Sequence, residues 1–259
     1  MKLGVIFCGF NTAQYISNSL QPWVQAREKQ IGGNQIVISA VSVPFIRFPA
    51  SRTDDSGEII RDYFLNGFID QITVHDNPLE EVVARGNALN YLKSVNCDAV
   101  IQVDSDEFYT LEQIEKILQI VNANPYIVWF RLSLKNYIFD GKTYLEEPFQ
   151  PPRIHRIKTI DGFEAAGFWD DNSVFYTNGK NTYQDRSFPT KTIHKNIVWV
   201  KHLTWLNDER GRDKVNYQKS RWGNDLCSYE WDDERKELKF NEAYYKRMGI
   251  PLPQIAKES

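Results

Sequence analysis

In the stretch Asp98-Ala-Val-Ile-Gln-Val-Asp104-Ser105-Asp106-Glu107, the most informative of the chain, an apolar run of strand type stops abruptly on carboxylates. A strand that is buried along its middle and exposed at its carboxyl end lies where open α/β sheets bind their ligands. Carboxylates clustered there repel one another unless a cation joins them. A hard divalent ion such as Mg²⁺ or Mn²⁺, held in turn by substrate phosphates, suits oxygen ligands in this position. The alternative interpretation is a solvated acidic turn that opens a helix.

Strand and helix patterns alternate along the first half of the chain. We expect strands at 2–8, 35–43 and 71–75, and helices at 12–27 and 58–66. A third helix opens at 76–78 and leaves Arg85 and Asn87 free of the core; its apolar face carries Leu79, Val82, Val83, Leu89 and Leu92. Thr110 and Gln113 form a capping-box pattern for a fourth helix, which ends at 124–125. This alternation predicts an α/β fold with a mostly parallel central sheet flanked by helices.

The second half of the chain is rich in aromatic residues. Six of the seven tryptophans lie beyond residue 128. Aromatic rings on irregular segments suit the apolar faces of sugars, although a core built from large side chains explains them equally well. We expect strands at 126–134 and 193–202 and helices at 209–222 and 237–248. Because no flexible linker interrupts the chain, we expect one compact domain with two functional halves, 1–135 and 136–259.

Composition sets limits on partners and location. With 259 residues and 42% hydrophobic residues, the chain can bury a sizeable core. A net charge of −3 gives no basic footprint, so no nucleic-acid partner is expected. No apolar run approaches the ~18 to 20 residues that cross a bilayer. A soluble, cytoplasmic protein is therefore expected, with peripheral membrane contact left open. The three cysteines are odd in number and far apart, which favours reduced thiols: Cys8, Cys97 and Cys227.

Several of these segments together resemble the GT-A fold glycosyltransferases, especially the family 2-like group. The resemblance covers residues 1–135 and rests on the first strand and turn at 7–16, the helix segment 81–89 and the Asp-x-Asp strand end. It implies a nucleotide diphosphate sugar held against the strand ends, with Asp104 and Asp106 binding ribose and a bridging divalent cation. The residues expected at the donor are Phe7, Gly9, Asn11, Asp76, Arg85, Asp104 and Ser105. The aspartate that the family carries after its second strand is missing, since Val41-Ser-Val-Pro44 stands there.

A second segment resembles the late strand of the same family. Trp199-Val-Lys-His202-Leu-Thr-Trp-Leu206 is similar to the strand that ends in a histidine ligand. The resemblance implies a metal site of Asp104, Asp106 and His202, and an imidazole added to carboxylates suits Mn²⁺ as well as Mg²⁺. A satisfied core histidine is the alternative. Nearby cations could face a diphosphate: Lys201, Arg210, Arg212 and Lys214.

The resemblance implies a metal-dependent glycosyltransferase that moves a sugar to a glycan or other hydroxyl acceptor, with inversion preferred. An inverting enzyme needs a carboxylate base. Asp170 and Asp171 beside Trp169 are the first candidates, followed by Glu164 and Asp185, and a polar surface loop is the alternative for the Trp169 segment. A sugar nucleotidylyltransferase of similar fold is a rival, although the turn at 9–12 lacks the usual Gly-rich, Arg-containing loop. A non-catalytic carbohydrate-binding or scaffold protein is the rival from another class.

Overall fold

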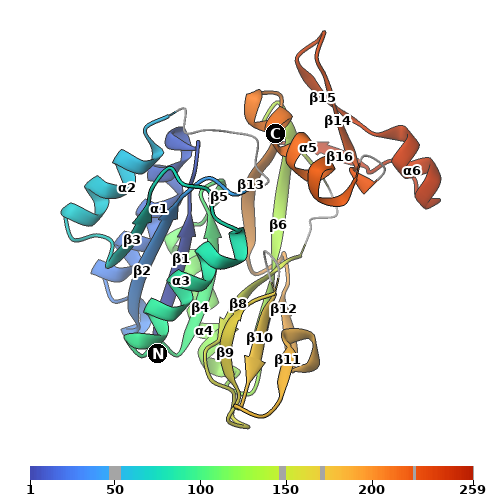
Figure 1. The fold of residues 1–259 in the computed structure, drawn as a ribbon. Helices are drawn as coiled ribbons and strands as arrows, with labels where there is room; N and C mark the ends of the chain where they lie inside the picture. The colour runs from blue at the N-terminus through green and yellow to red at the C-terminus, as the bar shows by residue number, and fades with distance from the viewer. Residues whose placement is uncertain (47–53, 146–149, 170–172, 224–225, 259) are drawn as a thin grey trace.

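The computed structural model describes residues 1–46, 54–145, 150–169, 173–223 and 226–258 (Figure 1). The first half alternates strands and helices as expected. Its strands are β1 (Lys2–Cys8), β2 (Gln35–Ser42), β3 (Gln71–Val74), β4 (Ala99–Asp104) and the short β5 (Glu107–Phe108). Its helices are α1 (Ala13–Glu28), α2 (Ser56–Leu65), α3 (Glu81–Ser94) and α4 (Leu111–Ala123), with a short 3-10 turn at Ile31–Gly33.

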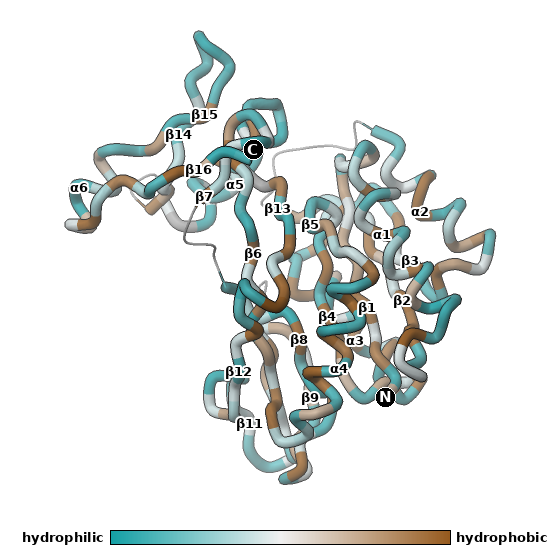
Figure 2. The backbone as a smooth tube through the Cα atoms, turned by 180° about the vertical axis from the view of Figure 1, so that it is seen from behind, coloured by the Kyte–Doolittle hydropathy of each residue, from teal (hydrophilic) through white to brown (hydrophobic). Residues whose placement is uncertain are grey.

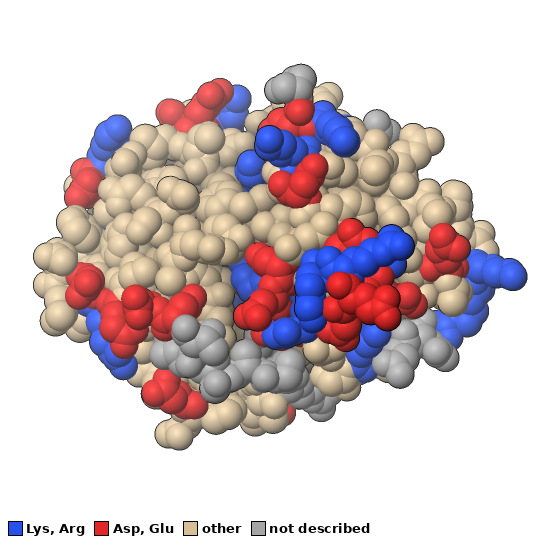
Figure 3. All heavy atoms as spheres, turned by 90° about the horizontal axis from the view of Figure 1, so that it is seen from above, with Lys and Arg blue, Asp and Glu red and all other residues tan. Residues whose placement is uncertain are grey.

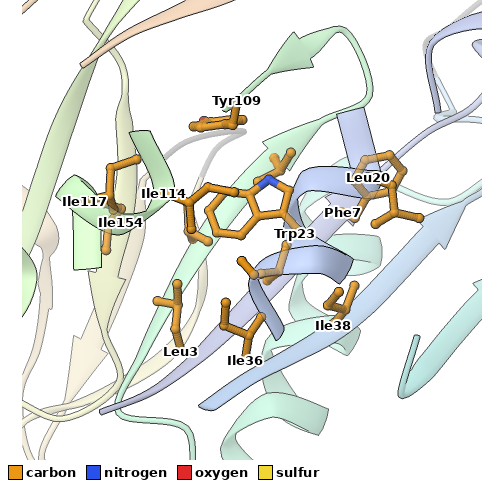
Figure 4. Close-up of a cluster of buried hydrophobic side chains, with 14 of the residues drawn as sticks. Leu3, Phe7, Leu20, Trp23, Ile36, Ile38, Tyr109, Ile114, Ile117 and Ile154 are labelled. Carbon is orange, nitrogen blue, oxygen red and sulfur yellow. The ribbon is translucent and has the colours of Figure 1, made fainter. Parts of the chain in front are cut away.

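The four long strands of this half form a parallel sheet in the order β4-β1-β2-β3. Alternate residues of β1 point to opposite faces, as a strand requires. Leu3, Val5 and Phe7 enter the core under α1, α2 and α4, whereas Ile6 and Cys8 enter the core under α3. Figure 4 shows the first core, where Trp23 of α1 lies among aliphatic side chains of β1, β2 and α4. Burial on both faces explains why these strands are apolar throughout.

The second half extends the sheet and adds two smaller ones. Strand β8 (Pro152–Arg156) lies antiparallel between β4 and β6 (Trp129–Phe139). Strands β12 (Thr190–Ile193) and β13 (Trp199–Leu206) run parallel to β6, and β7 (Thr143–Leu145) and β16 (Ile255–Lys257) complete the edge. The remaining elements are the sheet β9 (Glu164–Phe168), β10 (Val174–Thr177) and β11 (Thr182–Gln184), the 3-10 turn Asp185–Ser187, the hairpin β14 (Tyr229–Asp232) and β15 (Glu237–Phe240), and the helices α5 (Glu209–Trp222) and α6 (Glu242–Met248).

The fold class expected from the sequence is confirmed, and the differences are local. The strand expected at 193–202 is two strands, because the chain turns between them with Ile197 N–H bonded to the His194 carbonyl. The helix expected at 237–248 begins only after Asn241, whose side chain accepts from the Tyr244 N–H; residues 237–240 pair with β14 instead.

Helix α3 also differs from the expectation. It begins at Glu81, and Leu79 precedes it in a bridge to Phe45. Val83, expected on its apolar face, is 47% exposed, whereas Arg85, expected to be free of the core, is only 3% exposed. The helix is therefore turned so that Arg85 faces inward, towards the end of β4.

The distribution of charged and hydrophobic residues over the protein agrees with the composition of the sequence. Figure 2 shows hydrophobic stretches along the central strands, while the β14–β15 hairpin is mainly hydrophilic. Basic and acidic side chains are mixed on the face seen in Figure 3, and no continuous basic area covers it. Cys8, Cys97 and Cys227 are buried free thiols. Within the described ranges, no helix has both the length and the apolar character that a bilayer crossing requires.

Candidate functional site

A cavity of about 600 Å³ lies at the carboxyl ends of the first-half strands. Segments from both halves of the chain line it: the turn after β1, the ends of β2 and β4, helix α3, strands β6 and β8, and helix α5 with the hairpin that follows it. The carboxyl ends of parallel strands are the expected place for such a cavity, because the turns that leave these strands can present side chains to a ligand. The wall is mixed, with an apolar side formed by Val41, Val43 and Phe45.

Asp104 ends β4 and is held by two arginines. Its Oδ1 accepts a hydrogen bond of 2.8 Å from Arg85 Nη2, and its Oδ2 one of 3.1 Å from Arg153 Nη2. Burial alone would raise the pKa of Asp104, but the two guanidinium groups outweigh it and hold that pKa below its ordinary value. Asp104 is therefore a fixed anion at the floor of the cavity.

Asp106 lies two residues further and has different partners. Its Oδ2 accepts a 2.8 Å bond from Arg210 Nη2 of α5, and its Oδ1 lies 3.6 Å from Nε2 of His202 on β13. His202 Nδ1 is 2.7 Å from Oδ1 of Asn136 on β6. Burial lowers the pKa of His202 to about 4, so its imidazole is neutral at pH 7 and retains a lone pair.

Glu107 is a third carboxylate next to the end of β4, and it lies beneath the cavity. It is fully buried, and Arg153 pairs with it while Tyr109 donates to its Oε2 at 3.1 Å. Burial raises the pKa of Glu107 to about 7. Arg153 thus joins two carboxylates, Glu107 beneath the floor and Asp104 on it, and fixes the end of β4 from the second half of the chain.

The turn after β1 forms the side of the cavity next to Ser105. Asn11 adopts a left-handed backbone conformation with φ 52°, which asparagine tolerates better than most residues. The Ser105 hydroxyl donates to Thr12 Oγ1 at 2.7 Å, and the Ser105 N–H bonds to the Cys8 carbonyl. A Cβ on Gly9 would come within 3.3 Å of the Ser105 side chain. The turn and the Asp-x-Asp loop are therefore packed closely together.

Helix α5 covers the cavity from the second half. Near its start Arg210 holds Asp106, stacks its guanidinium 4.8 Å from the Tyr15 ring centre, and keeps Nη1 buried with no hydrogen-bond partner among the described residues. Near its end the Tyr217 hydroxyl donates to Glu81 Oε2 of α3 at 3.1 Å. Gly211 allows the helix to approach β13, because a Cβ there would lie 2.0 Å from the Leu206 carbonyl oxygen.

The side chains at the cavity supply only part of the ligands that a divalent cation needs. Among the described residues no group of three His, Cys, Asp or Glu side chains is close enough to hold an ion. Asp104 is engaged by Arg85 and Arg153, which leaves Asp106 Oδ1 and His202 Nε2 as the adjacent oxygen and nitrogen donors. Two protein ligands are enough for an ion whose remaining ligands are water and phosphate oxygens, as is usual for Mg²⁺.

The structure brings together most of the residues expected at the donor. Around the one cavity lie Gly9, Asn11, Arg85, Asp104, Ser105, Asp106 and His202, and two of the expected cations, Arg210 and Lys214. The Phe7 ring is instead part of the hydrophobic core, and Asp76 is exposed in the loop before α3. Lys201 points to the other face of β13, and Arg212 pairs with Asp213.

The residues expected as a base lie elsewhere or outside the described ranges. Asp170 and Asp171 belong to the residues that the structure does not describe, and the neighbouring Trp169 is 64% exposed. Glu164 lies at the start of β9 and pairs with Lys93 of α3 at 3.3 Å. Asp185 is buried, with Oδ2 3.9 Å from Nδ1 of His155 and accepting from the Val174 N–H.

Four residues at the cavity were not anticipated from the sequence. Arg153 and Asn136 lie within strands, and their partners lie 49 and 66 residues away in the chain. Glu81 and Tyr217 meet across 136 residues. No local pattern indicates such pairs, because each side chain finds its partner in an element that is distant in the sequence.

Comparisons with known proteins find similar folds. No protein-family model matches the sequence, and no curated protein matches it. S. aureus TarS 1-349 with UDP-GlcNAc is 19% identical with a TM-score of 0.39, over 53% of this chain and 35% of that one. TarS 1-349 in another crystal structure is 14% identical with a TM-score of 0.47, over 91% of this chain and 68% of that one.

Two further solved structures extend the comparison. Glucosyl-3-phosphoglycerate synthase from Mycobacterium tuberculosis, in complex with Mn²⁺, UDP and glucosyl-3-phosphoglycerate, is 14% identical with a TM-score of 0.34, over 52% of this chain and 44% of that one. A putative nucleotide-diphospho-sugar transferase from Desulfovibrio desulfuricans G20 is 10% identical with a TM-score of 0.33, over 60% of this chain and 63% of that one. The matched region spans about a third of the length of the first of the solved chains compared, TarS 1-349 with UDP-GlcNAc.

Proposed function

We propose that this protein is a glycosyltransferase that binds a nucleoside diphosphate sugar in the cavity above β4. The observation that carries the proposal is the pair Asp104 and Asp106, which lies at the carboxyl end of a buried strand and faces a cavity lined by cations. Anions recognised by such a site are small, because the protein has no extended basic surface on the face seen in Figure 3.

The cavity offers different surroundings to the two ends of a nucleotide. Val41, Val43 and Phe45 form an apolar side suited to the flat face of a base. On the opposite side, Arg210 and Lys214 of α5 line the cavity. The buried Nη1 of Arg210 has a proton to donate, and a diphosphate oxygen would satisfy it. We therefore assign the base to the β2 side and the diphosphate to the α5 side.

We further propose that Asp106 and His202 hold Mn²⁺ or Mg²⁺ together with the diphosphate. Such an ion stabilises the negative charge that develops on the nucleoside diphosphate as it leaves. Asn136 orients the ring of His202 and thereby directs Nε2 towards Asp106. Asp104, fixed by two arginines, is left to accept hydrogen bonds from the ribose hydroxyls.

The acceptor is proposed to be a saccharide or another hydroxyl compound, and the reaction to proceed with inversion. A carboxylate then removes the proton of the attacking hydroxyl. Asp170 and Asp171 remain the proposed bases. Asp213 is a further candidate, because it lines the cavity on α5, its side chain is 23% exposed, and Arg212 contacts only its Oδ1 in the described bonds; Glu81 is engaged through both oxygens by Arg85 and Tyr217.

Calorimetry of UDP and GDP binding, with and without Mn²⁺, tests the donor site. We expect Mn²⁺-dependent binding that is lost in Asp106→Asn, because this change removes the negative charge that the ion needs. Asp161→Asn, an exposed aspartate in the turn before β9, is the matched control. Unchanged nucleotide binding in Asp106→Asn would contradict the assignment. Release of pyrophosphate from a nucleoside triphosphate and a sugar 1-phosphate would favour a nucleotidylyltransferase instead.

A further inference from the structure

A second group of cations and aromatic rings lies on the outer face of β6 and β13. Lys135 and Lys201 are directly opposite each other on these parallel strands. Lys135 Nζ lies 4.0 Å from the ring centre of Tyr144 and 5.2 Å from that of Trp199, and Lys201 Nζ lies 4.3 Å from that of Tyr137. The two lysines are thus held over aromatic faces with their ammonium groups side by side.

This outer-face group already binds a carboxylate of the chain itself. Glu258 follows β16, and the Tyr137 hydroxyl donates to its Oε1. Lys135 Nζ lies 3.4 Å from the same oxygen, and Lys201 Nζ lies 3.8 Å from Oε2. The hydrogen bond from Tyr137, followed by the two lysines, lowers the pKa of Glu258. Two ammonium groups and a hydroxyl therefore converge on a single carboxylate.

Glu258 is held in a way that allows it to leave. Its side chain is 45% exposed, and β16 is a three-residue edge strand paired only with the three-residue β7 among the described strands. Ion pairs of this exposure are individually weak. The lysines and Tyr137 would keep their positions without Glu258, because β6 and β13 are central strands paired on both sides.

We propose that the outer-face group of Lys135, Tyr137, Tyr144, Trp199 and Lys201 is a binding site for the carboxylate of an acidic saccharide, and that Glu258 occupies it in the absence of this ligand. The partly exposed rings of Tyr144 and Trp199 supply the flat apolar surface on which a sugar ring packs, whereas the buried Tyr137 contributes its hydroxyl. The site is back to back with the cavity: His202 and Asn136 follow Lys201 and Lys135 in the same register and point to the opposite face. It is therefore a binding site separate from the cavity.

Binding of D-glucuronate to the full chain tests the inference, with D-glucose and acetate as reference compounds and Trp fluorescence or calorimetry as the readout. In Glu258→Gln we expect glucuronate to bind about fivefold more tightly than in the unaltered protein, because a competitor worth ~1 kcal/mol has been removed. Glu234→Gln, an exposed residue in the turn between β14 and β15, is the matched control and should leave the affinity unchanged. Lys201→Gln combined with Glu258→Gln should abolish the gain.

The outcomes separate this inference from the proposed function. Equal glucuronate affinity in Glu258→Gln and in the unaltered protein overturns the site. Acetate binding as tightly as glucuronate overturns the saccharide assignment, because the rings would then contribute nothing. UDP binding with Mn²⁺, measured on the same variants, should stay unchanged, so that loss of nucleotide binding reports on the cavity alone. Circular dichroism of each variant verifies that it is folded.

Discussion

At the scale of single residues, Arg153 is the side chain on which the site depends most. It enters from the second half, pairs with Asp104 on the cavity floor, and neutralises Glu107 beneath it. Removing one partner of a buried ion pair leaves a charge without compensation, which costs more than the pair itself contributes. The arginine therefore couples the geometry of the floor to the stability of the fold.

We expect Arg153→Met to lower the free energy of unfolding by about 3 to 5 kcal/mol, the usual effect of such a loss. Urea denaturation followed by circular dichroism measures it. Arg61→Met, which removes an exposed arginine paired with Glu58, should change stability by less than ~1 kcal/mol. Glu107→Gln added to Arg153→Met should restore part of the loss, because the uncompensated charge is gone. A stability change in Arg153→Met no larger than that of the control would contradict this account.

Thiol reactivity gives a second prediction at this scale. Burial raises the pKa of Cys97 to about 11, so almost no thiolate is present at pH 8. Because the thiolate is the nucleophile, we expect Cys97 to resist alkylation by iodoacetamide in the native protein and to react after denaturation in urea. Mass spectrometry of tryptic peptides measures the extent of modification. Rapid native-state alkylation of Cys97 at pH 8 would show that this thiol is not enclosed as described.

At the scale of elements, helix α5 carries the cavity-facing cations Arg210 and Lys214, and Gly211 sets how closely it approaches β13. We expect Gly211→Ala to destabilise the protein by at least ~1 kcal/mol and to weaken nucleotide binding, because the new Cβ would lie 2.0 Å from the Leu206 carbonyl oxygen. Gly86→Ala in α3 is the matched control, since nothing lies within 4 Å of its added Cβ. In an open helix position this change should stabilise by up to ~1 kcal/mol. Equal effects of the two substitutions would contradict the close approach of α5.

The strands and helices differ in how well the sequence predicts them. The strands and helices of residues 2–123 were predictable because fully buried strands are continuous apolar runs and the helices carry apolar stripes or caps, such as the capping box of Thr110 and Gln113. The helix predicted over 237–248 was wrong at 237–240, because apolar spacing alone cannot distinguish a helix from a strand followed by a helix. The hairpin partner β14 decides the state of 237–240, and this pairing is not a local property.

At the scale of the whole molecule, the sequence indicated one half of the site better than the other. The position of Asp104 and Asp106 at the strand end was predictable because a buried strand and its acidic end are adjacent in the chain. The places of three residues at the cavity could not be predicted, since each is set by a hydrogen bond to a partner in another element: Arg153, Asn136 and Tyr217. Both halves build the cavity, so the division at residue 135 separates sequence patterns that the fold joins.

Because the two halves of the chain share a sheet and a cavity, we expect them to unfold in one cooperative transition. Strand β8 of the second half lies between β4 and β6, and its Arg153 compensates the buried Glu107 of the first half. Six of the seven tryptophans lie beyond residue 128, so fluorescence reports mainly on the second half. Helices α1 to α4 hold most of the residues in the described α-helices, so ellipticity at the helix band reports mainly on the first half. We expect the urea transitions of the two signals to coincide. A nucleotide present at 100 times its dissociation constant should raise the free energy of unfolding obtained from each signal by about 2.7 kcal/mol. Two separated transitions, or a ligand that moves only one of them, would mean that the halves fold independently and that the cavity is not shared between them.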